Sequence, residues 1–236
     1  MKTLTTASRL WHFQRCPIIE SMPEVALREM DRISKEVRLG RGQILRPESY
    51  DFVYFIKTGA LKISTFSAEG KEIIIALLAP GDIFGELEDG ISMSEAMATA
   101  MENSVLNAVT NTQMESLLCK HPAIAMTVMK LGWRRVRTLC LRIADMLSRP
   151  AEQRLAVVLL QLSEDFGVPH PQGVHINLPI SHRDLASLIG CSREMVTQIM
   201  THFAREGVIV QGRKRIIVSD TKALEQIVTE AETATR

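Results

Sequence analysis

The 236-residue chain has few of the features that mark secreted, membrane-spanning or zinc-binding proteins. Its four cysteines are scattered and form no CxxC pair, which argues against a structural zinc site and is typical of a reduced cytoplasmic compartment. The strongest apolar run, Ile73 to Pro80, is far shorter than the roughly 20 residues that a membrane-spanning helix needs. The first residues contain no apolar stretch of the kind found in signal peptides. We therefore expect a cytoplasmic protein with no metal site and no membrane partner.

Common catalytic motifs are also missing. The sequence contains no P-loop, no GxSxG and no HExxH segment, and its six histidines are scattered. The formal net charge is only +1, so the overall charge favours neither nucleic acid nor an acidic partner. A composition of 46% hydrophobic and 23% charged residues is nevertheless sufficient for packed cores. We expect a globular protein that is not an enzyme and has no catalytic residues.

The N-terminal half shows two kinds of pattern. Apolar residues from Glu24 to Val37 recur at mostly helical spacing, so residues 1–40 are expected to form short helices. From Gln43 to about Val109, short apolar runs alternate with turns, many of which contain glycine. The predicted strands cover residues 52–56, 60–66, 72–78 and 104–110. Short strands at such close intervals favour a small antiparallel barrel or sandwich.

A helical pattern returns at a predicted capping box, Thr112 to Glu115, and a long helix is predicted from Pro122 to about Ser148. Two apolar columns with seven-residue spacing run along this helix. They are Ala125, Gly132, Leu139 and Met146, and Met129, Val136 and Ile143. Together they form an a/d seam of about three heptads. Packing on its own domain is the alternative, but we favour a dimerisation helix with contacts from Met129, Gly132, Val136, Leu139, Ile143 and Met146.

A domain boundary is expected at Arg149-Pro150, because the residue before a proline disfavours the α region and the long helix should end or bend there. Beyond it, an amphipathic helix is predicted from Glu152 to Glu164 and a loop from Val168 to Gly173.

Residues 181–205 have the pattern of a helix-turn-helix. Ser181 can cap a first helix from His182 to Leu188, and Ser192 can cap a second helix from Arg193 to about Arg205. Ala186, Gly190 and Val196 have the required spacing, because a small residue permits close helix packing and glycine permits the tight turn. The polar residues that face outward on the second helix are Ser192, Arg193, Glu194, Thr197 and Gln198. In such motifs, these are the side chains that enter the major groove.

A β wing is predicted after Gly207, with Arg213, Lys214 and Arg215 at its tip. From His182 to Arg215 there are six Lys and Arg against three Asp and Glu, a local excess that suits contact with phosphate. The predicted DNA-binding residues are Ser181, Arg183, Ser192, Arg193, Glu194, Thr197, Gln198, Arg213, Lys214 and Arg215.

Two segments carry a resemblance to a known family: Ile189 to Val196, which reads IGCSREMV, and Pro80 to Leu87, which reads PGDIFGEL. On these motifs the chain resembles the Crp/Fnr superfamily of bacterial transcription regulators. The resemblance implies an α+β fold with a cyclic-nucleotide-binding-like β-roll as effector or sensor domain (1–121), a long dimerisation helix (122–149) and a C-terminal winged helix-turn-helix (150–236). It also implies a homodimer that binds near-palindromic double-stranded DNA and has RNA polymerase as a partner.

The family's base-reading positions fall on Arg193, Glu194 and Gln198. Gln198 departs from the family pattern, in which arginine is typical at this position. The resemblance therefore does not specify the exact operator sequence.

The resemblance implies an effector pocket formed by Gly85, Glu86, Leu87, Ala96, Met97, Leu139 and Cys140. Family members that bind cyclic nucleotides hold the phosphate with an arginine followed by serine or threonine, and here these positions are Ala96 and Met97. No Lys or Arg occurs from Glu72 to Gln113, so a buried phosphate would lack a cation. We therefore predict that the chain does not bind cyclic AMP.

No cofactor is assigned by the sequence. An iron–sulfur cluster of the Fnr type needs several closely spaced N-terminal cysteines, and this chain has only Cys16 there. Haem is left open without specific support, with His12, Cys16, His121 and Cys140 as candidate axial ligands. A thiol switch at Cys16 or Cys119, a small metabolite and the absence of any ligand are the other open alternatives.

Overall fold

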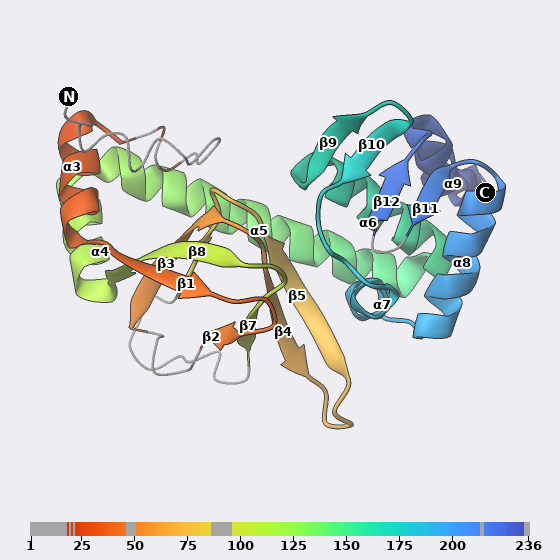
Figure 1. Cartoon of the computed structure of the whole chain (residues 1–236), viewed down its shortest axis with the longest axis horizontal. Helices are drawn as coiled ribbons and strands as arrows, with labels where there is room; N and C mark the ends of the chain where they lie inside the picture. Colours follow the sequence, from red (N-terminus) through yellow and green to blue (C-terminus); the bar gives the residue numbers. More distant parts are fainter. Residues whose placement is uncertain are drawn as a thin grey trace. The chain divides into compact units, whose positions relative to one another are not determined.

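The computed structural model describes residues 18, 20, 22–45, 51–85, 96–212 and 215–233, and it has the predicted α+β content (Figure 1). The chain divides into two compact units. The first comprises residues 1–69 and 75–137, and the second comprises residues 70–74 and 138–236.

Two four-stranded sheets make up most of the first unit, with strand orders β1-β8-β3-β6 and β2-β7-β4-β5. The strands are β1 (Lys35–Leu39), β2 (Ile44–Leu45), β3 (Phe52–Thr58), β4 (Leu61–Phe66), β5 (Glu72–Leu78), β6 (Ile83–Phe84), β7 (Met97–Ala100) and β8 (Ser104–Thr110). Leu61, Ile63 and Leu106 belong to the apolar cluster of this unit that draws on both sheets. The predicted small antiparallel β-domain is confirmed, because the described pairs in both sheets are antiparallel.

Two predictions at the edges of this unit were wrong. The helix α3 (Glu24–Ile33) ends before Val37, because Val37 lies in β1, which pairs along its whole length with β8. This non-local pairing overrides the helical spacing of the sequence. Helix α4 (Asn111–Lys120) is capped by Thr110 and Gln113 and not by Thr112.

The predicted long helix is α5 (Pro122–Ser148), and its residues are shared between the two units. The structure describes the whole of this helix, and Ile124 is the one residue of it that is buried. A helix of 27 residues with so little burial in a single chain leaves most of its apolar side chains exposed to solvent.

The second unit consists of four helices, α6 to α9, and a four-stranded sheet, besides the residues of α5 that belong to it. The elements are α6 (Ala151–Asp165), β9 (Gly167–His170), β10 (Gly173–Ile176), α7 (His182–Ile189), α8 (Arg193–Arg205), β11 (Ile209–Gly212), β12 (Arg215–Val218) and α9 (Thr221–Thr233). The sheet order is β11-β12-β10-β9. Leu155, Leu159 and Leu224 are fully buried, so α6 and α9 both contribute to the core of this unit.

The segment predicted as a loop at Val168 to Gly173 is instead the greater part of a β-hairpin. β9 pairs with β10, and Val174 of β10 pairs in turn with Val218 of β12. Pro169 is tolerated because β9 is an edge strand, where a missing backbone donor breaks no ladder. The wing is therefore the outer part of a four-stranded sheet.

A substitution at Gly173 tests how closely the start of β10 packs against β12. Its φ is +130°, and an added Cβ would lie 2.1 Å from the carbonyl oxygen of Val218. Gly207 also has a positive φ, +75°, but no atom lies within 4 Å of an added Cβ. Gly173→Ala should lower the free energy of unfolding of this unit by more than about 3 kcal/mol, and Gly207→Ala by about 1–2 kcal/mol. Urea denaturation measures both, and equal losses would contradict the close approach to Val218.

Candidate nucleic-acid interface

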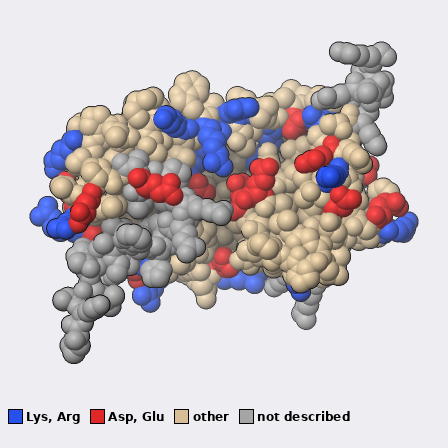
Figure 2. Space-filling model, turned by 90° about the horizontal axis from the view of Figure 1, so that it is seen from above, with Lys and Arg blue, Asp and Glu red and all other residues tan. Residues whose placement is uncertain are grey.

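Charges of both signs are interspersed on the face of the molecule shown in Figure 2, where neither sign forms a continuous field. Any surface that binds a polyanion such as DNA must therefore be a local cluster of positive side chains. In the second unit, four of the exposed cations, Arg183, Arg193, Arg205 and Arg215, belong to α7, α8 and β12.

The first helix of the predicted motif is built as expected, with one residue more. The Ser181 hydroxyl accepts from the Asp184 amide at 3.2 Å, and the Asp184 carboxylate accepts from the Ser181 amide at 3.0 Å. This capping box fixes the start of α7. Gly190 ends the helix at φ +66°, a left-handed conformation that favours glycine. Ser181 and Arg183 are both exposed at the start of α7.

The second helix, α8, presents the predicted DNA-reading residues to solvent. The Ser192 hydroxyl accepts from the Met195 amide at 3.1 Å and caps the helix. Val196, Met200 and Phe203 are fully buried on one face. The exposed polar residues of the first two turns and the cap are Ser192, Arg193, Glu194, Thr197 and Gln198. The structure thus brings all five together at the N-terminal end of one helix.

The wing supplies Arg215, which is exposed and lies with its Nη2 2.6 Å from Nε2 of His170 on β9. The other two predicted wing residues, Arg213 and Lys214, lie outside the described residues. The neighbouring His175 has a pKa below its usual value, chiefly because of burial and then because of the charge of Arg215.

One residue of this surface was missed at the sequence level. His182, the first residue of α7, contacts Thr197 on α8 and Gln211 on β11. No sequence signal marks it, because its partners are 15 and 29 residues away.

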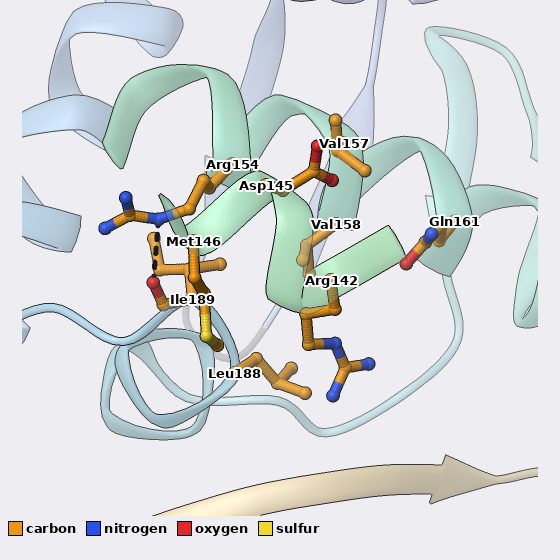
Figure 3. A pocket seen from close by; sticks show the side chains of 9 residues that line it. All are labelled: Arg142, Asp145, Met146, Arg154, Val157, Val158, Gln161, Leu188 and Ile189. Carbon is orange, nitrogen blue, oxygen red and sulfur yellow. Dashed lines mark hydrogen bonds between the residues drawn. The ribbon is translucent and has the colours of Figure 1, made fainter. Parts of the chain in front are cut away.

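Two arginines, Arg149 and Arg154, connect the end of α5 to other helices of the second unit, and Figure 3 draws the bond from Arg154 to the carbonyl of Ile189. Arg154 of α6 donates from Nε to the carbonyl of Ile189 at 2.9 Å and from Nη1 to the carbonyl of Arg149 at 2.7 Å. Arg149 in turn donates to Asp145 at 2.7 Å and to the carbonyl of Val228 at 2.6 Å. These bonds tie the last turn of α5 to α7 and α9, around the small cavity drawn in Figure 3.

The predicted dimerisation residues have different environments. Met129, Val136 and Ile143 are 49%, 51% and 58% exposed. Gly132 is exposed and Leu139 is half-buried. Met146 is 37% exposed and lies beside Gly190 of the helix-turn-helix.

A further apolar column on α5 was missed. Met126, Trp133 and Leu147 share a seven-residue spacing with Cys140, and they are 49%, 69% and 85% exposed. This column can form the a/d seam with Met129, Val136 and Ile143, which lie three residues further on. The sequence did not distinguish it from the column at 125, 132, 139 and 146.

The predicted effector positions offer little polar chemistry. Ala96 lies in the apolar core, and Met97 is half-buried opposite Ser64, a fully buried residue whose hydroxyl has no hydrogen-bond partner among the described residues. Gly85 has a φ of +145° and lies against the backbone of Phe52. On α5, Leu139 is half-buried and Cys140 is exposed. Glu86 and Leu87 lie outside the described residues.

Only some of the candidate cofactor residues lie in the part of the chain that the structure describes. His12 and Cys16 lie outside the described residues, His121 is half-buried, and Cys119 and Cys140 are exposed. No cluster of three metal-ligating side chains occurs among the residues that the structure describes. In the same part of the chain, no helix is long and apolar enough to cross a membrane.

Comparison with known proteins agrees with this geometry. Residues 37–121 match the cyclic nucleotide-binding domain, and residues 153–227 match the Crp-like helix-turn-helix domain. The global nitrogen regulator of Synechocystis sp. is 32% identical over 177 residues, which covers 74% of this chain and 79% of the relative. The cyclic AMP receptor protein of Thermus thermophilus is 32% identical over 179 residues, 74% of this chain and 78% of the relative.

Solved structures show the same fold. A CooA mutant from Carboxydothermus hydrogenoformans superposes with a TM-score of 0.72 at 21% identity, over 91% of this chain and 96% of that chain. FixK2 from Bradyrhizobium japonicum gives a TM-score of 0.73 at 21% identity, over 83% of this chain and 97% of that chain.

Proposed function

Because the chain belongs to the Crp/Fnr family of transcription regulators, we propose that it binds near-palindromic duplex DNA as a homodimer that cyclic AMP does not control. The family consists of regulators and not of enzymes. The observation that carries the proposal is the capped helix α8, with one face buried and the N-terminal polar residues exposed. RNA polymerase is the proposed protein partner, since a regulator of this family acts on transcription from its DNA site.

Base recognition is assigned to the N-terminal end of α8, the part of a recognition helix that reaches base edges. Arg193 can bond both acceptors of a guanine, Glu194 can accept from the amino group of cytosine, and Gln198 can pair with adenine. The exposed start of α7 and the wing suit phosphate contacts, which hold the protein in register without reading sequence. We assign Ser181, Arg183, Ser192, Arg213, Lys214 and Arg215 to these contacts.

The homodimer is supported by the exposed apolar side chains of α5. Met129, Trp133, Val136 and Ile143 are all at least 49% exposed, although they lie on neighbouring turns of one helix face. A second copy of the helix would bury them, at a gain of about 25 cal/mol per Å². Two copies of α8 would then read equivalent half-sites about one helical turn of DNA apart, which requires a near-palindrome.

Independence from cyclic AMP is supported by the two positions that replace the phosphate clamp. Ala96 and Met97 carry neither a charge nor a hydrogen-bond donor in their side chains. Burial of an unpaired phosphate costs several kcal/mol. The curated relatives include a cAMP-activated global regulator of Mycobacterium tuberculosis, which is 25% identical over 221 residues. Activation by cyclic AMP is a property of that relative. We expect this chain to lack it, because Ala96 and Met97 occupy the positions of the phosphate clamp.

Arg193 and Arg215 should have separable effects on DNA binding. Arg193→Ala should relax the sequence preference at one position of each half-site, because removal of a bidentate bond to guanine takes away about 1–3 kcal/mol of discrimination. Arg215→Ala should weaken all duplexes about equally and lower the salt dependence by about one unit for each arginine–phosphate pair that is removed. Selection from random duplexes measures the preference, and titration over a range of salt measures the slope. An unchanged motif for Arg193→Ala would refute its role in base reading.

Val136→Lys should convert the dimer into monomers, because two lysines would face each other across the seam and bury like charges. The mass in solution from light scattering is the measurement. Lys130 is exposed on the same helix, and Lys130→Ala serves as the control that should leave the dimer intact. A Val136→Lys protein that stays dimeric at micromolar concentration would place the seam elsewhere.

Cyclic AMP should have no effect on DNA affinity at physiological concentration, because Ala96 and Met97 cannot hold its phosphate. Isothermal titration calorimetry of the full chain should show no heat of binding up to about 100 μM cyclic AMP. Any binding free energy would then be weaker than about −5.5 kcal/mol. A micromolar dissociation constant would contradict this and would require a cation from another part of the dimer.

A further inference from the structure

His182 lies between the recognition helix and the wing. Its Nδ1 is 2.9 Å from the hydroxyl of Thr197 on α8, and its Nε2 lies against the side-chain amide of Gln211 on β11. One imidazole ring thus contacts both elements that the proposed function assigns to DNA. The ring is half-buried, whereas Thr197 and Gln211 are exposed at the surface.

The directions of these hydrogen bonds follow from the donors available. The Thr197 hydroxyl donates to the carbonyl oxygen of Arg193 at 2.9 Å, so it accepts a hydrogen bond from the N–H of the histidine ring. Nδ1 therefore carries the proton of a neutral ring, and Nε2 accepts from the amide N–H of Gln211. With the Thr197 hydroxyl bonded to the carbonyl of Arg193 and the Gln211 amide nitrogen facing the ring, this tautomer satisfies both ring nitrogens at once.

The surroundings favour the neutral ring. Burial lowers the pKa of His182, and the positive charge of Arg193 lowers it further. Arg183 and Asp184 follow His182 in the sequence of α7, and Glu194 follows Arg193 on α8, whereas β11 contributes no titratable side chain. Asp184 is engaged in the capping box with Ser181.

We propose that His182 is a positioning residue that holds wing strand β11 to recognition helix α8, so that base contacts and wing phosphate contacts engage DNA as one unit. The proposal rests on the proposed function, because it concerns how a DNA-binding surface is assembled. On the helix side, Thr197 lies one turn beyond Arg193. On the wing side, Gln211 pairs with Ile216, and the adjacent pair is Gly212 with Arg215. A fixed Gln211 therefore fixes the strand pair that carries Arg215.

The tautomer of His182 can be measured without any variant. In the full-length protein labelled with ¹⁵N at histidine, the two ring nitrogens of His182 should report a neutral ring with the proton on Nδ1 at pH 7.5. His182→Gln identifies the resonance by its disappearance. The more common Nε2–H form, or shifts that average the two forms, would overturn the proposal whether or not the protein binds DNA.

The coupling between helix and wing can be measured by a double-mutant cycle with Arg215→Ala. In the wild type, Arg215→Ala should weaken binding to the selected duplex by about tenfold, since it removes one charge-assisted phosphate bond in each dimer half. In proteins that carry Thr197→Val or Gln211→Met, the same change should cost about threefold or less. In these backgrounds the wing is no longer fixed to α8, so Arg215 contributes less to DNA affinity and its removal costs less.

Two further variants separate the two halves of the connection. His182→Asn keeps a donor near the position of Nδ1 and so retains the bond to Thr197, and His182→Gln keeps a polar group near the position of Nε2 and so retains the bond to Gln211. Each alone should show the same reduced coupling, because the connection needs both bonds. If His182 served stability alone, Arg215→Ala would weaken duplex binding by about tenfold in every background. That result would overturn the proposal. A wild type that binds no duplex would instead refute the proposed function, and the tautomer would remain a separate result.

Discussion

Burial of one face of α8 is the interaction on which the DNA-binding surface depends. Val196, Met200 and Phe203 are all fully buried, and each such side chain stabilises the folded state by about 1.5–3 kcal/mol relative to an exposed one. Because a helix has 3.6 residues per turn, burial of this face sets the rotation of α8 about its axis. Arg193 and Glu194 are then necessarily presented to solvent. The two serine caps and Gly190 fix where the helices of the motif begin and where the first one ends, so the reading residues are placed by packing and capping before any DNA is present.

The reading helix is connected to the rest of the chain by polar bonds to backbone carbonyls. Arg154 contacts the carbonyls of both Ile189 and Arg149, and Arg149 reaches the carbonyl of Val228. The last turn of α5 therefore belongs to the same packed unit as the helix-turn-helix. In the proposed dimer, the apolar stripe of α5 would set the separation of two recognition helices through these bonds. A net charge of only +1 means that affinity must come from this local arrangement and not from the field of the whole protein.

The helix-turn-helix could be predicted from the sequence nearly to the residue, because its signals are local: a serine cap at each start, glycine at the turn and apolar residues at helical spacing. The β9–β10 hairpin could not, because its position depends on pairing with β12, about 40 residues later along the chain. Val37 was placed in a helix for the same reason, since its partner strand β8 is distant in sequence. The column that contains Trp133 was missed because exposure depends on what the folded unit leaves uncovered. His182 was missed because both its partners come from other elements.

The central claim is that two copies of the chain bind one near-palindromic duplex through equivalent helices. The most direct measurement is the mass and affinity of complexes formed on a selected full site, on one half-site and on a scrambled duplex, by analytical ultracentrifugation at several salt concentrations. The account predicts two chains per full site, affinity at least about 10³-fold above the scrambled duplex, and a large decrease on the half-site. One chain per full site, or equal affinity for the scrambled duplex at physiological salt, would contradict it.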